Sequence, residues 1–163
     1  QTAARLMQQF VFKIIYMAHA ADYFSEEQQL MIKAAIVRAE RATSGEIRVC
    51  IDAHVLDDAF NRAVFWFEKL GMQHTKERNG VLIFIAAEDH KFSVIGDYGI
   101  HEKVTQQFWD NLVSEMKSFF SKNDLTGGLI HAIEHCGKAL AVYFPYHKND
   151  IDELPNEMIF GGR

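Results

Sequence analysis

The chain has 163 residues, of which 48% are hydrophobic and 24% are charged, and its formal net charge is −5. These values describe one globular domain of ordinary size and exclude an intrinsically disordered chain. The acidic balance, with no basic stripe to offset it, excludes nucleic-acid binding through phosphate neutralisation. The two cysteines, Cys50 and Cys136, form no Cys-x-x-Cys motif, and we expect two buried, reduced thiols.

The first 23 residues are expected to form an amphipathic helix or an extension ahead of the main domain. Seven apolar residues fall at helical spacing along this segment: Leu6, Met7, Phe10, Val11, Ile14, Ile15 and Ala18. Lys13 interrupts the apolar run, which is too short to span a bilayer, so we expect no transmembrane segment. The stripe could dock on the domain, on a membrane-associated partner or on a second copy of the chain, which would make a homo-oligomer.

Residues 18–20, Ala-His-Ala, also resemble a signal-peptidase site. We expect a cytoplasmic protein, and the alternative is an exported or periplasmic one if residues 1–20 belong to a signal segment.

The main domain, residues 24–148, begins with a helix and a strand. Ser25 and Gln28 have capping-box spacing, which predicts a helix that starts at Ser25 and stops near residues 43–45. Residues 46–53 alternate, which predicts a strand with one less buried face. Its buried face carries Ile47, Val49, Ile51 and Ala53. A second helix is predicted from Asp57 through Leu70.

The apolar run at residues 81–87 follows Asn79-Gly80 without a polar interruption. It is too short for a helix and rich in β-branched and aromatic residues, so it predicts a strand buried on both faces at the centre of a sheet. The preceding strand–helix–strand order makes the first two strands parallel. A hairpin-length connection at residues 88–91 makes the third strand, residues 91–96, antiparallel to the second.

The remaining residues predict two more helices. One runs from about Glu102 to Phe120, residues 124–128 interrupt, and the last runs to about Phe144, where Pro145 stops it. Residues 149–163 are predicted to be an irregular tail. The sequence therefore predicts an α/β fold, with a small mixed β-sheet and helices on both faces.

This topology gathers polar residues at two opposite ends of the sheet. One end collects Glu46, Arg78, Asn79, Asp97 and Tyr98, and the other collects Asp52, Asp57, Asp58, Glu88 and Asp89. Carboxylate oxygens suit calcium or magnesium, so we expect such an ion. Asp97 and Glu46 are the first-choice ligands, and the carboxylates of the other end are the second choice. The alternative at the first end is that Arg78 forms an ion pair with Glu46 or Asp97. The alternative at the other end is that Asp57-Asp58 only begins a helix and Glu88-Asp89 only forms a turn.

Residues 131–135, His-Ala-Ile-Glu-His, match the H-x-x-E-H zinc pattern. The two histidines fall opposite Leu129, Ile133 and Leu140 around the helix, so we interpret them as a solvated face. No Ser-His-Asp order and no P-loop is present. A phosphatase here would need a metal-activated water near Asp97 and Arg78 to hold the phosphate, and no covalent nucleophile is assignable.

Three glycine-containing motifs in this order resemble the TPM domain family: TSGEI at 43–47, RNGVL at 78–82 and GDYGI at 96–100. Residues 120–129 match the family's last segment, so the resemblance spans roughly residues 24–145. Phe108-Trp109 and residues 152–157 resemble a compact bacterial branch of the family.

The resemblance implies a three-layer α/β/α sandwich, calcium binding and acid phosphatase activity. The family was named from a thylakoid acid phosphatase, a photosystem II repair protein and a receptor-associated membrane protein. In this chain it implies Asp97 and Arg78 as catalytic candidates, and Glu46, Arg78, Asn79 and Tyr98 as ligand-binding ones. We expect a metal-binding interaction module serving membrane-protein assembly or repair. The alternative is a metal-dependent acid phosphatase acting on phosphomonoesters.

Overall fold

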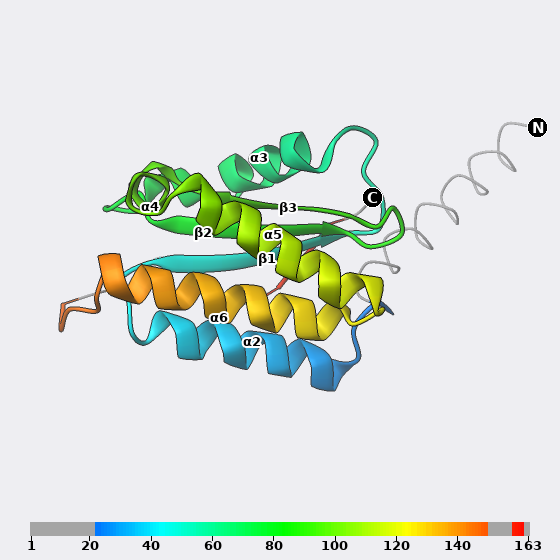
Figure 1. The fold of residues 1–163 in the computed structure, drawn as a ribbon, viewed down its shortest axis with the longest axis horizontal. Coiled ribbons are helices and arrows are strands. Elements are labelled where there is room, and N and C mark those ends of the chain that lie inside the picture. The colour runs from blue at the N-terminus through cyan, green and yellow to red at the C-terminus, as the bar shows by residue number, and fades with distance from the viewer. Residues whose placement is uncertain (1–21, 150–157, 162–163) are drawn as a thin grey trace, which may run out of the picture.

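A mixed four-stranded sheet forms the centre of the computed structural model, which describes residues 22–149 and 158–161 (Figure 1). Its strand order is β3-β2-β1-β4, with β1 at Glu46–Asp52, β2 at Gly80–Ala86, β3 at Lys91–Gly96 and β4 at Ile159–Phe160. The expected N-terminal helix and most of the expected irregular tail lie outside the described residues. None of the described helices has the length and apolar character that a bilayer span requires.

The apolar run after Gly80 forms β2, which lies inside the sheet and is buried along its whole length. It pairs in parallel with β1, where Ile47 faces Val81 in register, and antiparallel with β3, where Ile83 faces Val94. Both strand directions and the interior position of β2 confirm the prediction.

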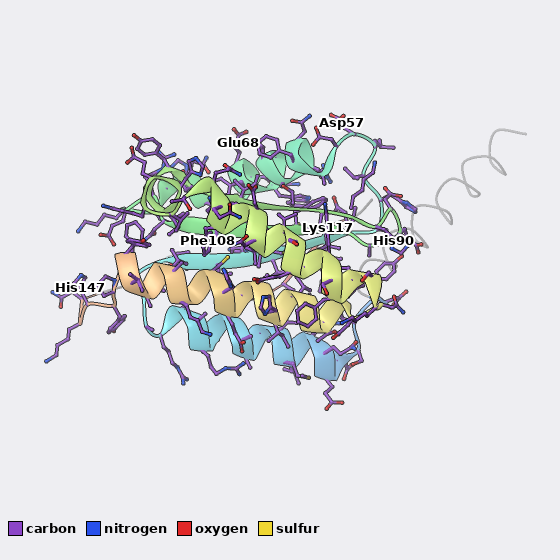
Figure 2. The ribbon with its side chains drawn as sticks, viewed as in Figure 1. Asp57, Glu68, His90, Phe108, Lys117 and His147 are labelled. Atoms are coloured by element: carbon purple, nitrogen blue, oxygen red, sulfur yellow. The ribbon has the colours of Figure 1, made fainter. Side chains whose placement is uncertain are left out.

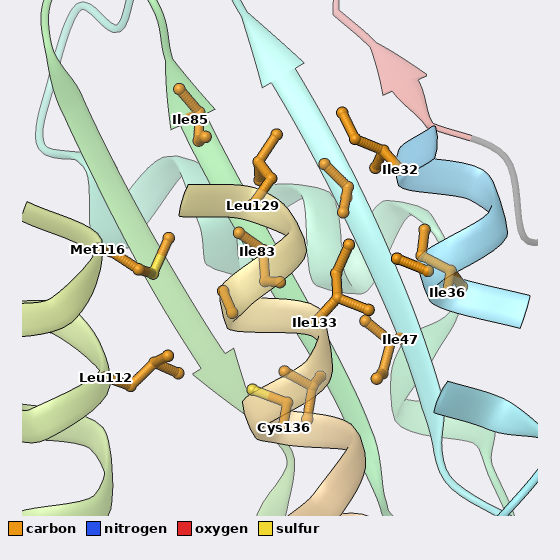
Figure 3. Close-up of a cluster of buried hydrophobic side chains, with 14 of the residues drawn as sticks. Ile32, Ile36, Ile47, Ile83, Ile85, Leu112, Met116, Leu129, Ile133 and Cys136 are labelled. Atoms are coloured by element: carbon orange, nitrogen blue, oxygen red, sulfur yellow. The ribbon is translucent and has the colours of Figure 1, made fainter. Parts of the chain in front are cut away.

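Helices cover both faces of the sheet. Helices α2 (Glu26–Glu40), α5 (Gln106–Ser121) and α6 (Leu125–Tyr143) lie on one face, and α3 (Ala59–Lys69) lies on the other (Figure 1). The larger core layer joins Ile32 of α2, Ile83 of β2 and Ile133 of α6 (Figure 3). The fold is therefore the predicted α/β architecture with a small mixed sheet.

Each core layer contains one of the two cysteines, and both thiols are free and buried, as expected. Burial raises the pKa of the Cys136 thiol to about 12, and burial also raises the pKa of the Cys50 thiol. A thiol held in its protonated form is a poor nucleophile and a poor metal ligand, so both cysteines are packing residues.

The prediction that one face of β1 is less buried is wrong, because all seven of its residues are buried. Helix α3 covers that face, where Cys50 packs with Trp66 and Phe67. The outer edge of β1 pairs with β4, whose Ile159 lies in register with Cys50. Strand β4 falls in the tail that was predicted to be irregular.

Two predicted helix boundaries are also wrong. The helix expected from Glu102 to Phe120 is divided into α4 (Tyr98–Lys103) and α5, with Val104 and Thr105 in extended conformation between them. Asp97 caps α4, so this helix begins within the GDYGI motif. Helix α6 begins at Leu125 rather than after residue 128, because Asp124 caps it by accepting a hydrogen bond from the Gly127 N–H.

Candidate metal centre on α5 and α6

Two histidines of α6 and one glutamate of α5 form a compact group of metal-ligating side chains. His131 and His135 are four residues apart, which places them on one side of α6, and Glu115 faces them from α5. His131 Nε2 lies 2.5 Å from Glu115 Oε2, and His135 Nδ1 lies 3.6 Å from the same oxygen. One ligand atom from each residue fits within a 4.8 Å separation, and among the described residues no other three His, Cys, Asp or Glu side chains do so.

Aromatic rings flank the two imidazoles along α5. Phe119 packs against His131 with ring centroids 5.2 Å apart, and Phe108 packs against His135 at 5.0 Å. The hydrogen bond with His131 lowers the pKa of Glu115, so this carboxylate stays ionised over the physiological range. The group is half-buried: the side chains of His131, His135 and Glu115 are 34%, 31% and 42% exposed.

The interpretation of His131 and His135 as a solvated face is therefore wrong. Leu129 and Ile133 of α6 do pack on the sheet, but α5 runs alongside α6 and covers the flank that carries the histidines. Glu134, the acidic residue of the H-x-x-E-H pattern, instead approaches Arg38 of α2 at 3.8 Å. The third member of the group is Glu115, which lies among the inward residues Leu112 and Met116 and the half-buried Phe119. Its place at the edge of the apolar side of α5 is the signal that the sequence offered for it.

At the end of the sheet where Asp97 and Glu46 were expected to bind a metal, Arg78 and Asp97 form an ion pair. Asp97 Oδ2 accepts from Arg78 Nε at 2.7 Å and Oδ1 accepts from Nη2 at 2.9 Å, and Asp97 is buried. The hydrogen bonds to Asp97 raise the pKa of Arg78. Asn79 donates from Nδ2 to Ser44 Oγ at 3.1 Å, and the exposed Tyr98 hydroxyl donates to Glu102 at 2.5 Å.

Glu46, the other first-choice metal ligand, is buried at the start of β1. It pairs in register with Gly80, whose carbonyl accepts from the Asp97 N–H at 2.8 Å. Glu46 on β1 and Asp97 just after β3 therefore lie on opposite sides of β2, and their backbones are separated by two strand spacings, about 10 Å. The fold brings Arg78 to Asp97 and places Glu46 on the far side of β2.

At the opposite end, the five acidic residues have separate local partners. Asp52 accepts from Arg62 Nε at 2.7 Å and from Trp66 Nε1 at 3.2 Å. Asp58 caps α3, and Asn61 contacts both Asp57 and Asp58. Asp89 accepts from the Val55 N–H at 2.6 Å and contacts His54, while Glu88 accepts from the Tyr23 hydroxyl. Within the described residues no three of these carboxylates come together as the histidine group does.

The fold and this polar geometry define an α/β domain in which one glutamate and two histidines, side chains of the types that ligate metals, lie together on two packed helices. The family model of the TPM domain matches residues 17–139, and the chain belongs to this family. Among solved structures, the BA42 protein of the psychrophilic bacterium Bizionia argentinensis is 43% identical, with a TM-score of 0.79 over 85% of this chain and 95% of that one. This confirms the resemblance and the fold class.

A second solved structure shows the same fold at lower similarity. The N-terminal domain of cg2496 from Corynebacterium glutamicum is 17% identical, with a TM-score of 0.56 over 72% of this chain and 74% of that one. None of the functionally curated proteins matches the chain.

Proposed function

We propose that this domain is a divalent-metal-binding module rather than a hydrolase. The observation that carries the proposal is the convergence of Glu115, His131 and His135, whose ligand atoms lie within 4.8 Å of one another on two packed helices. Three side chains that already face each other need little rearrangement to share an ion. The two cysteines, in contrast, are buried with raised pKa values, which makes them poor nucleophiles.

Calcium binding by the carboxylates at the sheet ends would be a second, separate metal site, supported by the family resemblance and by the preference of calcium for carboxylate oxygens. Asp97 and Glu46 are the first choice, but Asp97 already accepts two hydrogen bonds from Arg78, so calcium would have to displace them. A role in membrane-protein assembly or repair likewise rests on the family. In that role the domain would recruit a protein partner through a metal-dependent surface.

The metal-dependent acid phosphatase is the second candidate, and the placement of Arg78 supports it. The guanidinium is half-exposed at a polar end of the sheet, and its fork geometry matches phosphate as well as carboxylate. Because Asp97 holds two of its N–H groups, phosphate binding would compete with this ion pair.

Two measurements decide between the candidates. Calorimetric titration of the metal-free protein with zinc, calcium and magnesium chlorides should show binding of at least one ion near one equivalent. Turnover of p-nitrophenyl phosphate, with each ion or with EDTA, should be absent across the acidic and neutral pH range. The proposal falls if no divalent ion binds. Turnover that is lost in Arg78→Ala and Asp97→Asn, with both variants folded, would establish the phosphatase instead.

A further inference from the structure

We infer that the Glu115–His131–His135 group selects a borderline transition ion of the Zn²⁺ type and holds it with an open coordination position. This inference rests on the proposed metal-binding function and names the ion class and the coordination of that site. The observations behind it are the donor types, their separations and their partial exposure to solvent.

The donor set favours zinc-type ions over calcium and magnesium. Imidazole nitrogens are good ligands for Zn²⁺, Cu²⁺ and Ni²⁺, and two of the three side chains here are imidazoles. Calcium takes six to eight oxygen ligands, and magnesium requires an octahedron of oxygens. Glu115 is the only carboxylate of the group, so neither hard ion finds its preferred ligands here.

The separations match a zinc site after small side-chain movements. Bonds of about 2.0–2.1 Å in a tetrahedron place neighbouring ligand atoms about 3.3 Å apart. The His135–Glu115 separation of 3.6 Å is already close to that value, and the His131–Glu115 separation of 2.5 Å is a direct hydrogen bond that an entering ion would replace. All three side chains project from regular helices and their ligand atoms already lie within 4.8 Å of one another, so rotation about side-chain bonds is the movement that the site requires.

The group supplies three ligands, and no fourth His, Cys, Asp or Glu of the described residues joins it. Structural zinc sites are closed by four protein ligands, whereas sites with three keep a position for water or an exchangeable ligand. With 31–42% of each side chain exposed, solvent and a small external donor can reach the ion. The site thus offers a metal-dependent attachment point for an imidazole or carboxylate of a partner.

Cobalt(II) provides a direct test, because it replaces Zn²⁺ and its visible absorption reports coordination number and ligand type. Titration of the metal-free full chain with CoCl₂ should give an intense band that saturates at one equivalent and is bleached by ZnCl₂. Glu115→Gln and His131→Asn lie on different helices, and each should weaken Co²⁺ binding at least tenfold. Addition of imidazole to the loaded protein should shift the band, which reports the open position.

His90→Asn is the matched control. His90 is exposed in the β2–β3 turn (Figure 2) and is not a member of the group, and its positive φ of 52° suits asparagine. Its Co²⁺ affinity should stay within twofold of wild type. Equal Co²⁺ binding by all three variants, or an imidazole-insensitive band, would overturn the inference.

The same titrations separate this inference from the broader function. If calcium or magnesium binds and neither Zn²⁺ nor Co²⁺ does, the metal-binding module stands and the ion class assigned here is wrong. If no divalent ion binds at all, both are wrong.

Discussion

The Asp97 carboxylate accepts two hydrogen bonds from the Arg78 guanidinium and a third, at 2.7 Å, from the Tyr98 N–H at the start of α4. Only 6% of the Asp97 side chain is exposed, compared with 51% for Arg78. One buried carboxylate therefore fixes both the loop before β2 and the helix after β3.

We expect Asp97→Ala to destabilise the protein more than Arg78→Gln does. The alanine variant loses the helix cap, which alone is worth about 0.5–2 kcal/mol, together with the ion pair. Asp97→Asn keeps a capping oxygen and loses the charge, so its free energy of unfolding should fall between the other two. Urea unfolding monitored by tryptophan fluorescence measures the order, and an Arg78→Gln variant that is the least stable of the three would contradict it.

Gly99 lies against the backbone of the loop before β2, and its N–H donates to the Arg78 carbonyl at 2.8 Å. A Cβ at this position would lie 2.2 Å from the Glu77 carbonyl oxygen and 2.6 Å from that of Arg78. Backbone atoms cannot swing aside as a side chain can, so Gly99→Ala should cost about 1–3 kcal/mol of unfolding free energy.

Gly80→Ala provides the comparison for Gly99, because its added Cβ meets the Met72 carbonyl at 3.3 Å and requires only a slight shift. Chemical denaturation of the two variants side by side should show the larger loss at Gly99. Similar losses at the two glycines would mean that the loop moves freely.

Asp52 is fully buried and depends on Arg62 and Trp66 of α3 for its hydrogen bonds. Its Oδ1 has no hydrogen-bond donor among the described residues. Arg62→Met should therefore lower the free energy of unfolding by about 3–5 kcal/mol, because the buried carboxylate would lose the guanidinium with which it forms an ion pair. Adding Asp52→Asn should recover part of that loss. A double-mutant cycle in guanidinium chloride measures the coupling, and strictly additive losses would contradict it.

The hydrogen bond with His54, followed by that from the Val55 N–H, lowers the pKa of Asp89 below its ordinary value of 3.8. A carboxyl with a lowered folded-state pKa stabilises the fold above its unfolded pKa, and this stabilisation is lost as pH falls through the folded value. Wild type should therefore lose stability on acidification below about pH 4 more steeply than Asp89→Asn. Parallel acid-unfolding curves followed by circular dichroism would contradict this.

Local sequence patterns predicted the elements that are marked by their own residues, such as an unbroken apolar run or a capping box. The run after Gly80 predicted the interior strand because β2 is apolar on both faces, and Ser25 predicted the start of α2 because its capping box is local. The break between α4 and α5 carries no glycine or proline, and its one local signal is Thr105, an N-cap residue type that makes no side-chain capping bond here. Strand β4 is two residues long, which is too short for an alternating pattern.

The metal-ligating group was missed for a different reason. Its histidines were visible as a motif, but Glu115 lies 16 residues before His131 on another helix, and only the packing of α5 beside α6 brings it close. The burial of Asp52 likewise depends on Arg62 and Trp66, which approach from α3. Periodicity indicates which side of one helix is apolar, and it does not indicate which neighbour covers its flank.

Strand β4 closes part of an open sheet edge. It pairs with only two residues of β1, Cys50 and Ile51, and the Gly161 N–H adds a bond to the Ile51 carbonyl at 2.8 Å. A fragment that ended after α6 would leave the N–H and C=O groups on this side of β1 available to another extended chain. Because β1 is buried throughout and carries Ile47, Val49 and Ile51, such a fragment would be prone to edge-to-edge aggregation, so residues 159–161 protect the solubility of the domain.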